Sequence, residues 1–373
     1  MFNPRKALLQ GSTWALSCNP FGIAFFLSYS TVDIRHSTLN PMGSNDYLSE
    51  DGLAMVALCS SLALPEEAAA DRPEPFKLSE WNQLEKQLQS SSLKRPSALQ
   101  ERSPEELCKE FPISPLDAQR VTELLGRTGQ ITLELETFSA RGIWAVTRID
   151  ELYPAKLRDT LKHQAPTVLF GAGPIHLLGK SGVAVVGSRN IDEPGAEFAR
   201  AIGAKISAAG LPVVSGGARG TDRLAMDGAL QVGGKAVGAL ADSLEATIRK
   251  SDVRELVLDE RLVLITAYAP TAGFSVGAAM GRNKMIYGLS EFAIVVSSDH
   301  QTGGTWAGAV EALRAGWCPV FVRSGAEVPK GNEELIKRGA LPLRQEDLQS
   351  MDNLVEWAEG RLPVKSLERD LFG

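Results

Sequence analysis

The sequence has few of the features that mark membrane, secreted or zinc-binding proteins. No apolar run approaches the ~20 residues that a bilayer-spanning helix needs. Only four cysteines occur, far apart and without a CxxC or Cys/His pair, which disfavours a disulfide framework and a zinc site. Free thiols suit a reducing compartment. We therefore expect a cytoplasmic protein that has no membrane association and binds no metal.

Two common phosphate-binding motifs are also missing. Neither the GxGxxG fingerprint of dinucleotide-binding folds nor the GxxxxGK[ST] phosphate loop is present. The four histidines are scattered, so a histidine general base would lack a partner. The sequence thus predicts no cofactor and no catalytic residue.

Excess positive charge is absent too. The formal net charge of −6 argues weakly against nonspecific binding of polyanions. Between positions 183 and 344, however, basic and acidic residues nearly balance, so the acidity lies elsewhere in the chain. Any anion site in this segment must come from local loops rather than from overall charge.

The N-terminal part is predicted to be a leader, residues 1–75. Met42 opens a stretch from which a helical pattern continues, so residues 1–41 are interpreted as an over-extended gene start or a disordered leader. A signal peptide is a third interpretation, against which Gln10, Ser12 and Asn19 interrupt the apolar residues. Residues 62–75 are rich in proline, alanine and acid, which is typical of a linker.

Residues 76–150 carry repeated helix-start signals. Ser79 is a candidate N-cap, and Ser103 precedes Pro104 and Glu106 in the capping-box arrangement. A third start at "SPLDAQRVTELLG" stops at Gly126. These signals predict a small domain of three or four short helices.

From about residue 151 to 345, short β-branched runs that end in glycine alternate with helical segments. Strands separated by helices of 10–15 residues predict an α/β fold with a doubly wound, Rossmann-like, mostly parallel sheet. Residues 346–373 are predicted to be a short C-terminal tail. Ligands of such sheets bind at the carboxyl ends of the strands, where strand order reverses.

Four segments at predicted strand ends are candidates for chemistry: residues 187–189, 215–220, 282–284 and 302–305. Gly216 and Gly217 permit close backbone approach, and the following helix start offers unpaired N–H groups to an anion. Arg189, Arg219 and Lys284 would add positive charge. The alternative is that these glycines only make tight turns.

These segments carry a resemblance to a known family. "VAVVGSRN", "VVSGGARGTDRLAMDGAL", "GRNKMIYGLSEFAIVVSS" and "TGGTWAGAVEALRAGWCPVFV" occur in the order seen in the DNA-processing protein A (DprA/Smf) family. The resemblance covers about residues 76–345 and implies that the small helical domain is SAM-like or helix-hairpin-helix (HhH)-like. It implies a cytosolic protein of DNA recombination and natural transformation, not an enzyme, that binds single-stranded DNA, forms a homodimer through its sheet domain and helps to load the RecA recombinase.

The residues expected to contact DNA or phosphate come from the four segments together. They are Gly187, Ser188, Arg189, Ser215, Gly216, Gly217, Ala218, Arg219, Gly220, Arg282, Asn283, Lys284, Gly303, Gly304 and Thr305. Asp222 has a supporting role, in which it either orients Arg219 or caps the helix. Phe274 and Tyr287 are candidate base-stacking residues, with packing as the alternative.

The sequence departs from the family pattern at several positions. Met226 stands where the family usually has histidine, Lys284 replaces the second arginine of RNR, and Ala279 and Met280 replace a Phe-Pro pair. One alternative function is a nucleotide-sensing module of a stress or antiphage pathway. Another is a nucleoside-monophosphate phosphoribohydrolase, but the spacing from Gly304 to Glu311 does not match the pattern of those enzymes.

Overall fold

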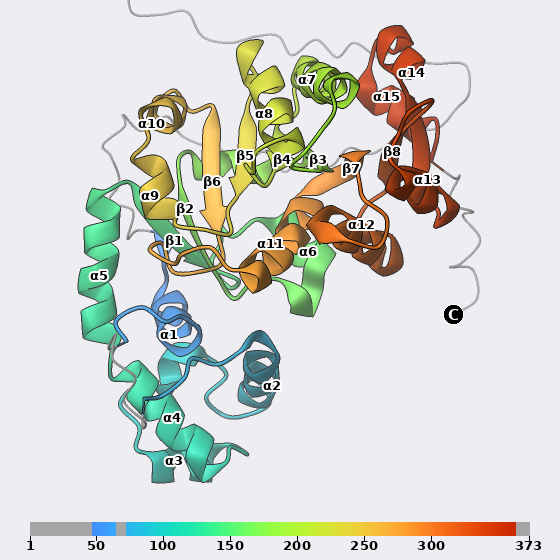
Figure 1. Ribbon diagram of the computed structural model, residues 1–373. Coiled ribbons are helices and arrows are strands. Elements are labelled where there is room, and N and C mark those ends of the chain that lie inside the picture. Colours follow the sequence, from blue (N-terminus) through green and yellow to red (C-terminus); the bar gives the residue numbers. More distant parts are fainter. Residues whose placement is uncertain (1–46, 65–71, 363–373) are drawn as a thin grey trace, which may run out of the picture. The chain divides into compact units, whose positions relative to one another are not determined.

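A nine-stranded sheet dominates the part of the chain that the structure describes, residues 47–64 and 72–362 of this computed structural model (Figure 1). The strand order is β1-β2-β6-β5-β4-β3-β7-β8-β9. The strands are β1 (Ile143–Thr147), β2 (Val168–Ala172), β3 (Gly182–Gly187), β4 (Val213–Ser215), β5 (Ala236–Ala239), β6 (Leu262–Thr266), β7 (Ser290–Ser297), β8 (Val320–Ser324) and β9 (Leu341–Arg344).

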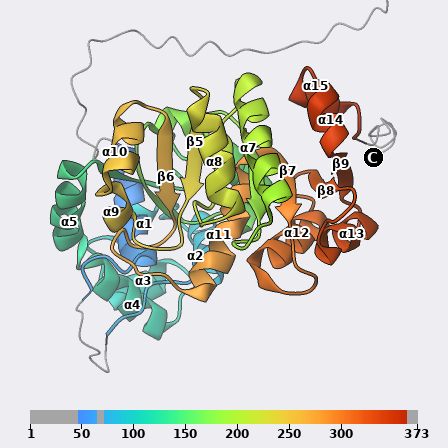
Figure 2. The ribbon, with the colours of Figure 1, turned by 45° about the horizontal axis from the view of Figure 1, so that its top comes forward.

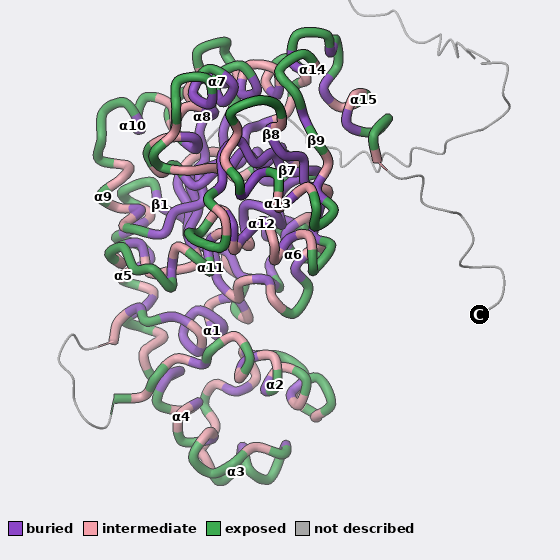
Figure 3. The backbone as a smooth tube through the Cα atoms, turned by 45° about the vertical axis from the view of Figure 1, so that its right-hand side comes forward, coloured by how far each residue is buried: buried purple, intermediate pink, exposed green. Residues whose placement is uncertain are grey.

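The run β6-β5-β4-β3-β7-β8-β9 is parallel throughout, whereas β2 is antiparallel to both β1 and β6. The central strand β3 has the sequence GVAVVG and is buried along nearly its whole length, as expected for a parallel strand covered on both faces. Figure 3 shows that the neighbouring strands β7 and β8 also lie in the buried part of the molecule. The predicted fold class, α/β with a doubly wound, mostly parallel sheet, is confirmed.

Helices cover both faces of the sheet, and alternate residues of β3 face different helices. Val183 and Val185 belong to the core that contains Phe198, whereas Ala184 and Val186 belong to the core that contains Met285. Figures 1 and 2 show α7 and α8 side by side over one face. The helices of this part are α6 (Ala155–Leu161), α7 (Glu193–Ala208), α8 (Thr221–Gln231), α9 (Leu244–Ile248), α10 (Ser251–Leu258), α11 (Val276–Gly288), α12 (Gly303–Ala315) and α13 (Lys330–Lys337), with 3₁₀ turns η3 (Lys162–Gln164) and η4 (Ile175–Gly179).

The helical segment before the sheet contains five α-helices and one 3₁₀ turn within the described residues. They are α1 (Glu50–Cys59), α2 (Leu78–Gln89), η2 (Pro96–Leu99), α3 (Pro104–Glu110), α4 (Pro115–Leu125) and α5 (Thr128–Ala140). The predicted capping box of α3 is present, because the Ser103 side chain accepts from Glu106 N and the Glu106 carboxylate accepts from Ser103 N. The Ser79 prediction is wrong: the N-cap position is Lys77, two residues earlier, and Ser79 lies within α2.

The predicted leader extends too far along the chain. Helix α1 lies within residues 1–75, yet its residues from Ala54 to Leu58 are completely buried. Its start is tied to the beginning of the sheet, because the Ser49 hydroxyl donates to the Asp150 carboxylate at 2.6 Å. Residues 47–64 are therefore part of the folded core. The interpretations of residues 1–41 lie outside the described residues.

The predicted C-terminal tail also needs correction. After β9 the chain forms α14 (Gln345–Ser350) and α15 (Leu354–Glu359), in which Leu348, Leu354 and Ala358 are buried. The Lys205 ammonium of α7 donates to the Met351 carbonyl at 2.7 Å. Residues 346–362 thus pack on the sheet domain, and this packing buries the few apolar residues of the two short helices.

The described residues contain neither a candidate membrane span nor a candidate metal site. No helix within residues 47–64 and 72–362 is both long and apolar enough to cross a membrane. In the same residues no group of three His, Cys, Asp or Glu side chains is placed to hold a metal ion, and Cys59, Cys108 and Cys318 are free.

Candidate functional site

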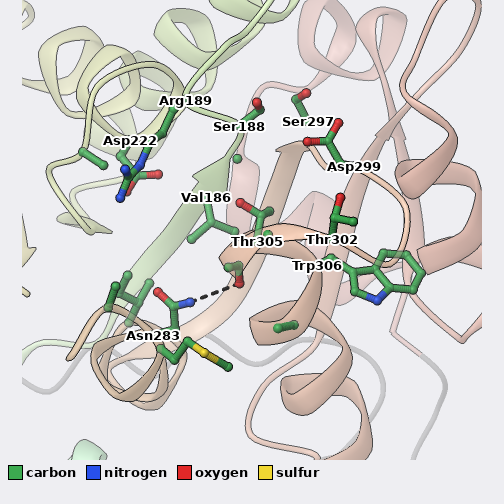
Figure 4. Close-up of a pocket in the computed structure, with 18 of the residues that line it drawn as sticks. Val186, Ser188, Arg189, Asp222, Asn283, Ser297, Asp299, Thr302, Thr305 and Trp306 are labelled. Atoms are coloured by element: carbon green, nitrogen blue, oxygen red, sulfur yellow. Dashed lines mark hydrogen bonds between the residues drawn. The ribbon is translucent and has the colours of Figure 1, made fainter. Parts of the chain in front are cut away.

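A cavity of about 760 Å³ opens at the carboxyl ends of β3 and β7. From β3 the chain builds outward through β4, β5 and β6 on one side, and β7 returns to the other side of β3, so strand order reverses here. Ser188 N donates to Ser297 O at 2.8 Å, which holds the two strand ends together. Figure 4 shows Ser188, Ser297 and Thr305 around this space, with Arg189 and Asp222 at one end and Trp306 at the other. We call it the switch-point cavity.

The turn after β3 is pressed against the start of α8, and glycine permits this approach. Thr221 N and Thr221 Oγ1 both donate to Ser188 O, at 3.2 and 3.1 Å. Gly220 has φ +83°, and a Cβ there would lie 2.6 Å from the carbonyl oxygens of Ser188 and Arg189. Only glycine satisfies both the backbone angle and the space. The structure therefore joins the predicted segments 187–189 and 215–220 into one wall.

The N-terminus of α12 forms the opposite wall. Thr302 is its N-cap and makes no capping hydrogen bond through its side chain, and Gly303 has φ +77°. The first N–H groups of a helix lack partners within the helix and attract anions. Gly303, Gly304 and Thr305, which the sequence singled out as phosphate contacts, all line the cavity.

Residues 282–284 do not form a strand-end loop, so that part of the prediction is wrong. They lie within α11, which begins after Ser275, whose hydroxyl accepts from Ala278 N at 3.0 Å. Asn283 faces the cavity, and its Nδ2 donates to Gly304 O at 3.1 Å, which links α11 to the start of α12 (Figure 4). The side chains of Arg282, Asn283 and Lys284 point in different directions from α11.

Arg282 is largely buried beneath the glycine turn, although it also contributes to the lining of the cavity. It is 6% exposed, and its Nη1 donates to Ala239 O at 2.9 Å. A Cβ at Gly216 would lie 1.4 Å from this nitrogen, so the absence of a side chain at Gly216 makes room for the guanidinium. Burial lowers the pKa of Arg282, and the charge of Asp222 opposes this shift. Its Nε has no hydrogen-bond partner among the described residues.

Asp222 is the buried carboxylate of the site. It is 7% exposed, and burial raises its pKa to about 6, although the charge of Arg282 and the N–H groups of Ala218, Gly216 and Gly187 favour the ionised form. Of the two predicted roles, orientation of Arg219 is not seen. Arg219 Nη2 instead donates to Asn190 Oδ1 at 3.4 Å. Asp222 and Arg282 are therefore two buried ionisable groups between the loops, and each influences the pKa of the other.

The two candidate stacking residues lie in different environments. Phe274 is 54% exposed, and the Arg189 guanidinium carbon lies 5.6 Å from the centre of its ring. Tyr287 is 1% exposed, so it packs in the core and offers no face to a base. Phe274 is available for stacking from the cavity mouth.

Lys284 does not line the switch-point cavity. Its ammonium forms an ion pair with Glu311 at 3.0 Å and donates to Gln164 Oε1 at 2.9 Å.

Asp299 and Trp306 also line the cavity, although the sequence did not identify them as candidates. Asp299 follows β7 after one serine, and this strand-end position was the available signal. Trp306 lies one residue beyond the predicted glycine pair and Thr305, edge-on to the His300 ring at 5.1 Å between centroids.

Comparison with known proteins agrees with this arrangement. A family model described as DNA recombination-mediator protein A matches residues 144–354. The chain belongs to this family. The match runs from the second residue of β1 to the first residue of α15, so it includes all but one residue of the sheet and the whole of α14. The resemblance inferred from the sequence motifs is thereby confirmed.

Individual relatives match part of the chain. Protein Smf of Escherichia coli K12 is 30% identical over 214 residues, 55% of this chain and 54% of that protein. DNA processing protein DprA of Streptococcus pneumoniae R6 is 32% identical over 157 residues, 42% of this chain and 54% of that protein. The chain thus spans about half the length of these curated relatives. An X-ray structure of the S. pneumoniae protein aligns with a TM-score of 0.52 and 26% identity, over 63% of this chain and 81% of that chain.

Proposed function

We propose that this protein is a recombination mediator that binds the backbone of single-stranded DNA at the switch-point cavity. The observation that carries the proposal is the convergence of three glycine-containing segments on one cavity at the point where strand order reverses. The unpaired N–H groups at the start of α12 suit phosphate oxygens, whereas the N–H groups of Gly187, Gly216 and Ala218 are directed at the Asp222 carboxylate. At about 760 Å³, the cavity is large enough for more than a lone phosphate.

The exposed cations and one exposed ring complete the proposed interface. Arg189 and Arg219 are exposed, so their guanidinium groups can reach a strand, whereas Arg282 acts from beneath the turn. Phe274 would stack on a base, a contact that tolerates any sequence. Lys284 is engaged with Glu311 and contributes least.

Three further parts of the proposal come from the family resemblance: loading of RecA onto the bound strand, a homodimer formed through the sheet domain, and a cytoplasmic location. We propose a binding role rather than catalysis. A phosphoribohydrolase needs a glutamate at the sugar, and Glu311 is instead paired with Lys284 away from the cavity lining.

The test is a titration with a labelled single strand of about 20 nucleotides at several salt concentrations, with duplex DNA and mononucleotides as competitors. We expect strand-selective binding with a steep salt dependence. Arg189→Ala and Arg219→Ala should each weaken binding and lower the salt slope by about 0.7 per lost phosphate contact. Arg158→Ala on α6, whose side chain is 44% exposed, is the matched control.

Two outcomes would contradict the proposal. Absence of strand binding at low salt would exclude the mediator role. Binding of mononucleotides without competition from single-stranded DNA would favour the nucleotide-sensing alternative, and release of free base would indicate an enzyme.

A further inference from the structure

A second cavity, of about 430 Å³, lies next to the switch-point cavity. It is enclosed by α8, α9, α10 and the ends of β5 and β6, and we call it the side cavity. Arg189, Ala218, Phe274 and Arg282 line both cavities. The Arg189–Phe274 pair therefore lies at the boundary between the two cavities.

The floor of the side cavity is apolar. Its lining includes Met226, Leu240, Val253, Leu256, Leu262 and Leu264. Met226 is the position at which the sequence departs from the histidine of the resembling family, and it supplies a polarizable thioether instead of a polar ring. Such a floor suits the faces of a flat, weakly polar group.

The charge of the two cavities differs. The lining of the switch-point cavity contains two arginines, Arg189 and Arg282, and two carboxylates, Asp222 and Asp299. The lining of the side cavity contains these same arginines together with Arg219, Arg223 and Lys250, against the carboxylates of Asp227 and Asp242 only. Positive charge is therefore in excess in the side cavity and balanced in its neighbour.

Several of these cations have no carboxylate partner. Arg223 forms ion pairs with Asp227 and Asp252, but Arg189, Arg219 and Lys250 form none within 4.0 Å among the described residues. Arg282, whose buried Nε also lacks a hydrogen-bond partner within that part of the chain, lines the cavity too. A buried donor without an acceptor is unfavourable, and an anionic ligand would relieve it.

We propose that the side cavity is a nucleotide subsite, with the base on the apolar floor and the phosphate at the turn formed by residues 216–220. A base has apolar faces and polar edges, and the exposed carboxylate of Asp242 can accept from an amino group at the edge. Its volume lies within the roughly 300–1,000 Å³ of small-ligand sites. The nucleotide comes from the bound strand or from the free pool. The first case rests on the proposed function, since the strand would pass the Arg189–Phe274 pair.

The test fills the side cavity with a bulky side chain from helix α10. Leu256→Trp, on α10, places a bulky ring in the cavity, and Leu258→Trp is the matched control because Leu258 lies on the same helix, is 70% exposed and does not line the cavity. Thymidine monophosphate and an oligothymidylate of about 20 nucleotides serve as probes. We expect Leu256→Trp to weaken binding of at least one probe about tenfold relative to Leu258→Trp. Loss for the mononucleotide identifies a free nucleotide, and loss for the oligonucleotide alone identifies a nucleotide of the strand.

Equal binding of both probes by the two variants would overturn the subsite. If the wild-type protein binds the oligonucleotide but the variants do not differ, the subsite fails and the proposed function stands. If the oligonucleotide does not bind while Leu256→Trp still abolishes mononucleotide binding, the proposed function fails and the subsite stands. Should Leu256→Trp not fold, photocrosslinking of wild-type protein to 5-bromodeoxyuridine probes decides: crosslinks within α8 to β6 support the subsite, and crosslinks confined to the switch-point cavity overturn it.

Discussion

The buried Asp222 carboxylate predicts an unusual pH dependence of stability. Its pKa is raised from the ordinary 3.8 to about 6 by burial, against the opposing effects of Arg282 and nearby N–H groups. Between these two pH values the folded protein binds more protons at this position than the unfolded chain, so the free energy of unfolding falls as pH rises. At 1.36 kcal/mol per pKa unit, this fall is about 3 kcal/mol. The contribution is complete below pH 3.8 and is lost above about pH 6.

Asp222→Asn removes this titration and keeps the size of the side chain. Below about pH 6 the wild-type carboxyl is itself protonated, so Arg282 lacks a charged partner in both proteins, and the attraction between Arg282 and ionised Asp222 is already contained in this pKa. The quantity to measure is the difference in the free energy of unfolding between wild type and variant, from urea denaturation followed by tryptophan fluorescence between about pH 3.5 and pH 7. We expect wild type to lose about 3 kcal/mol relative to Asp222→Asn across this range.

Asp252→Asn provides a control of opposite sign. Asp252 is exposed, and its hydrogen bond to Arg223 lowers its pKa, so its stabilisation is present at neutral pH and lost as pH falls. The two variants should therefore diverge from wild type in opposite directions. A difference between wild type and Asp222→Asn that stays constant with pH would refute the claim that this carboxyl is buried and hard to ionise.

Two further predictions follow from the same loops. Gly220→Ala should lower the free energy of unfolding by well over the ~1 kcal/mol expected of Gly233→Ala. Both glycines have φ near +83°, but only a Cβ at Gly220 would meet carbonyl oxygens, at 2.6 Å. Chemical denaturation of the two variants measures this difference, and equal losses of stability would contradict it. Phe274→Ala should weaken single-strand binding by about 1–3 kcal/mol, measured by fluorescence anisotropy, whereas Val232→Ala, at a residue 59% exposed and outside both cavities, should leave it unchanged. An unaltered affinity of Phe274→Ala would exclude stacking on this ring.

Local sequence signals were sufficient to predict structural features that depend only on residues close together in the chain. The capping box at Ser103 and Glu106 lies where the sequence placed it, because both hydrogen bonds close within one helical turn. The helical pattern of α1 was visible in the sequence, but its place in the folded core was missed because its burial depends on distant partners: Asp150, 101 residues away, binds its N-cap. The same holds for α14 and α15, whose few apolar residues are buried only against the completed sheet.

For the candidate site, the sequence by itself determined which residues stand at the strand ends. Glycine, serine and arginine after buried β-branched runs identified the turns after β3 and β4 and the start of α12, since the alternation of strands and helices is a property of the chain. Tertiary structure alone decided the direction of each cation. Arg282 and Lys284 are two residues apart in one helix, yet one guanidinium is buried under Gly216 and the other charge pairs with Glu311, because successive helical residues face different neighbours. The partition of positive charge between two adjoining cavities likewise exists only once α8, α9 and α10 are packed around the ends of the strands.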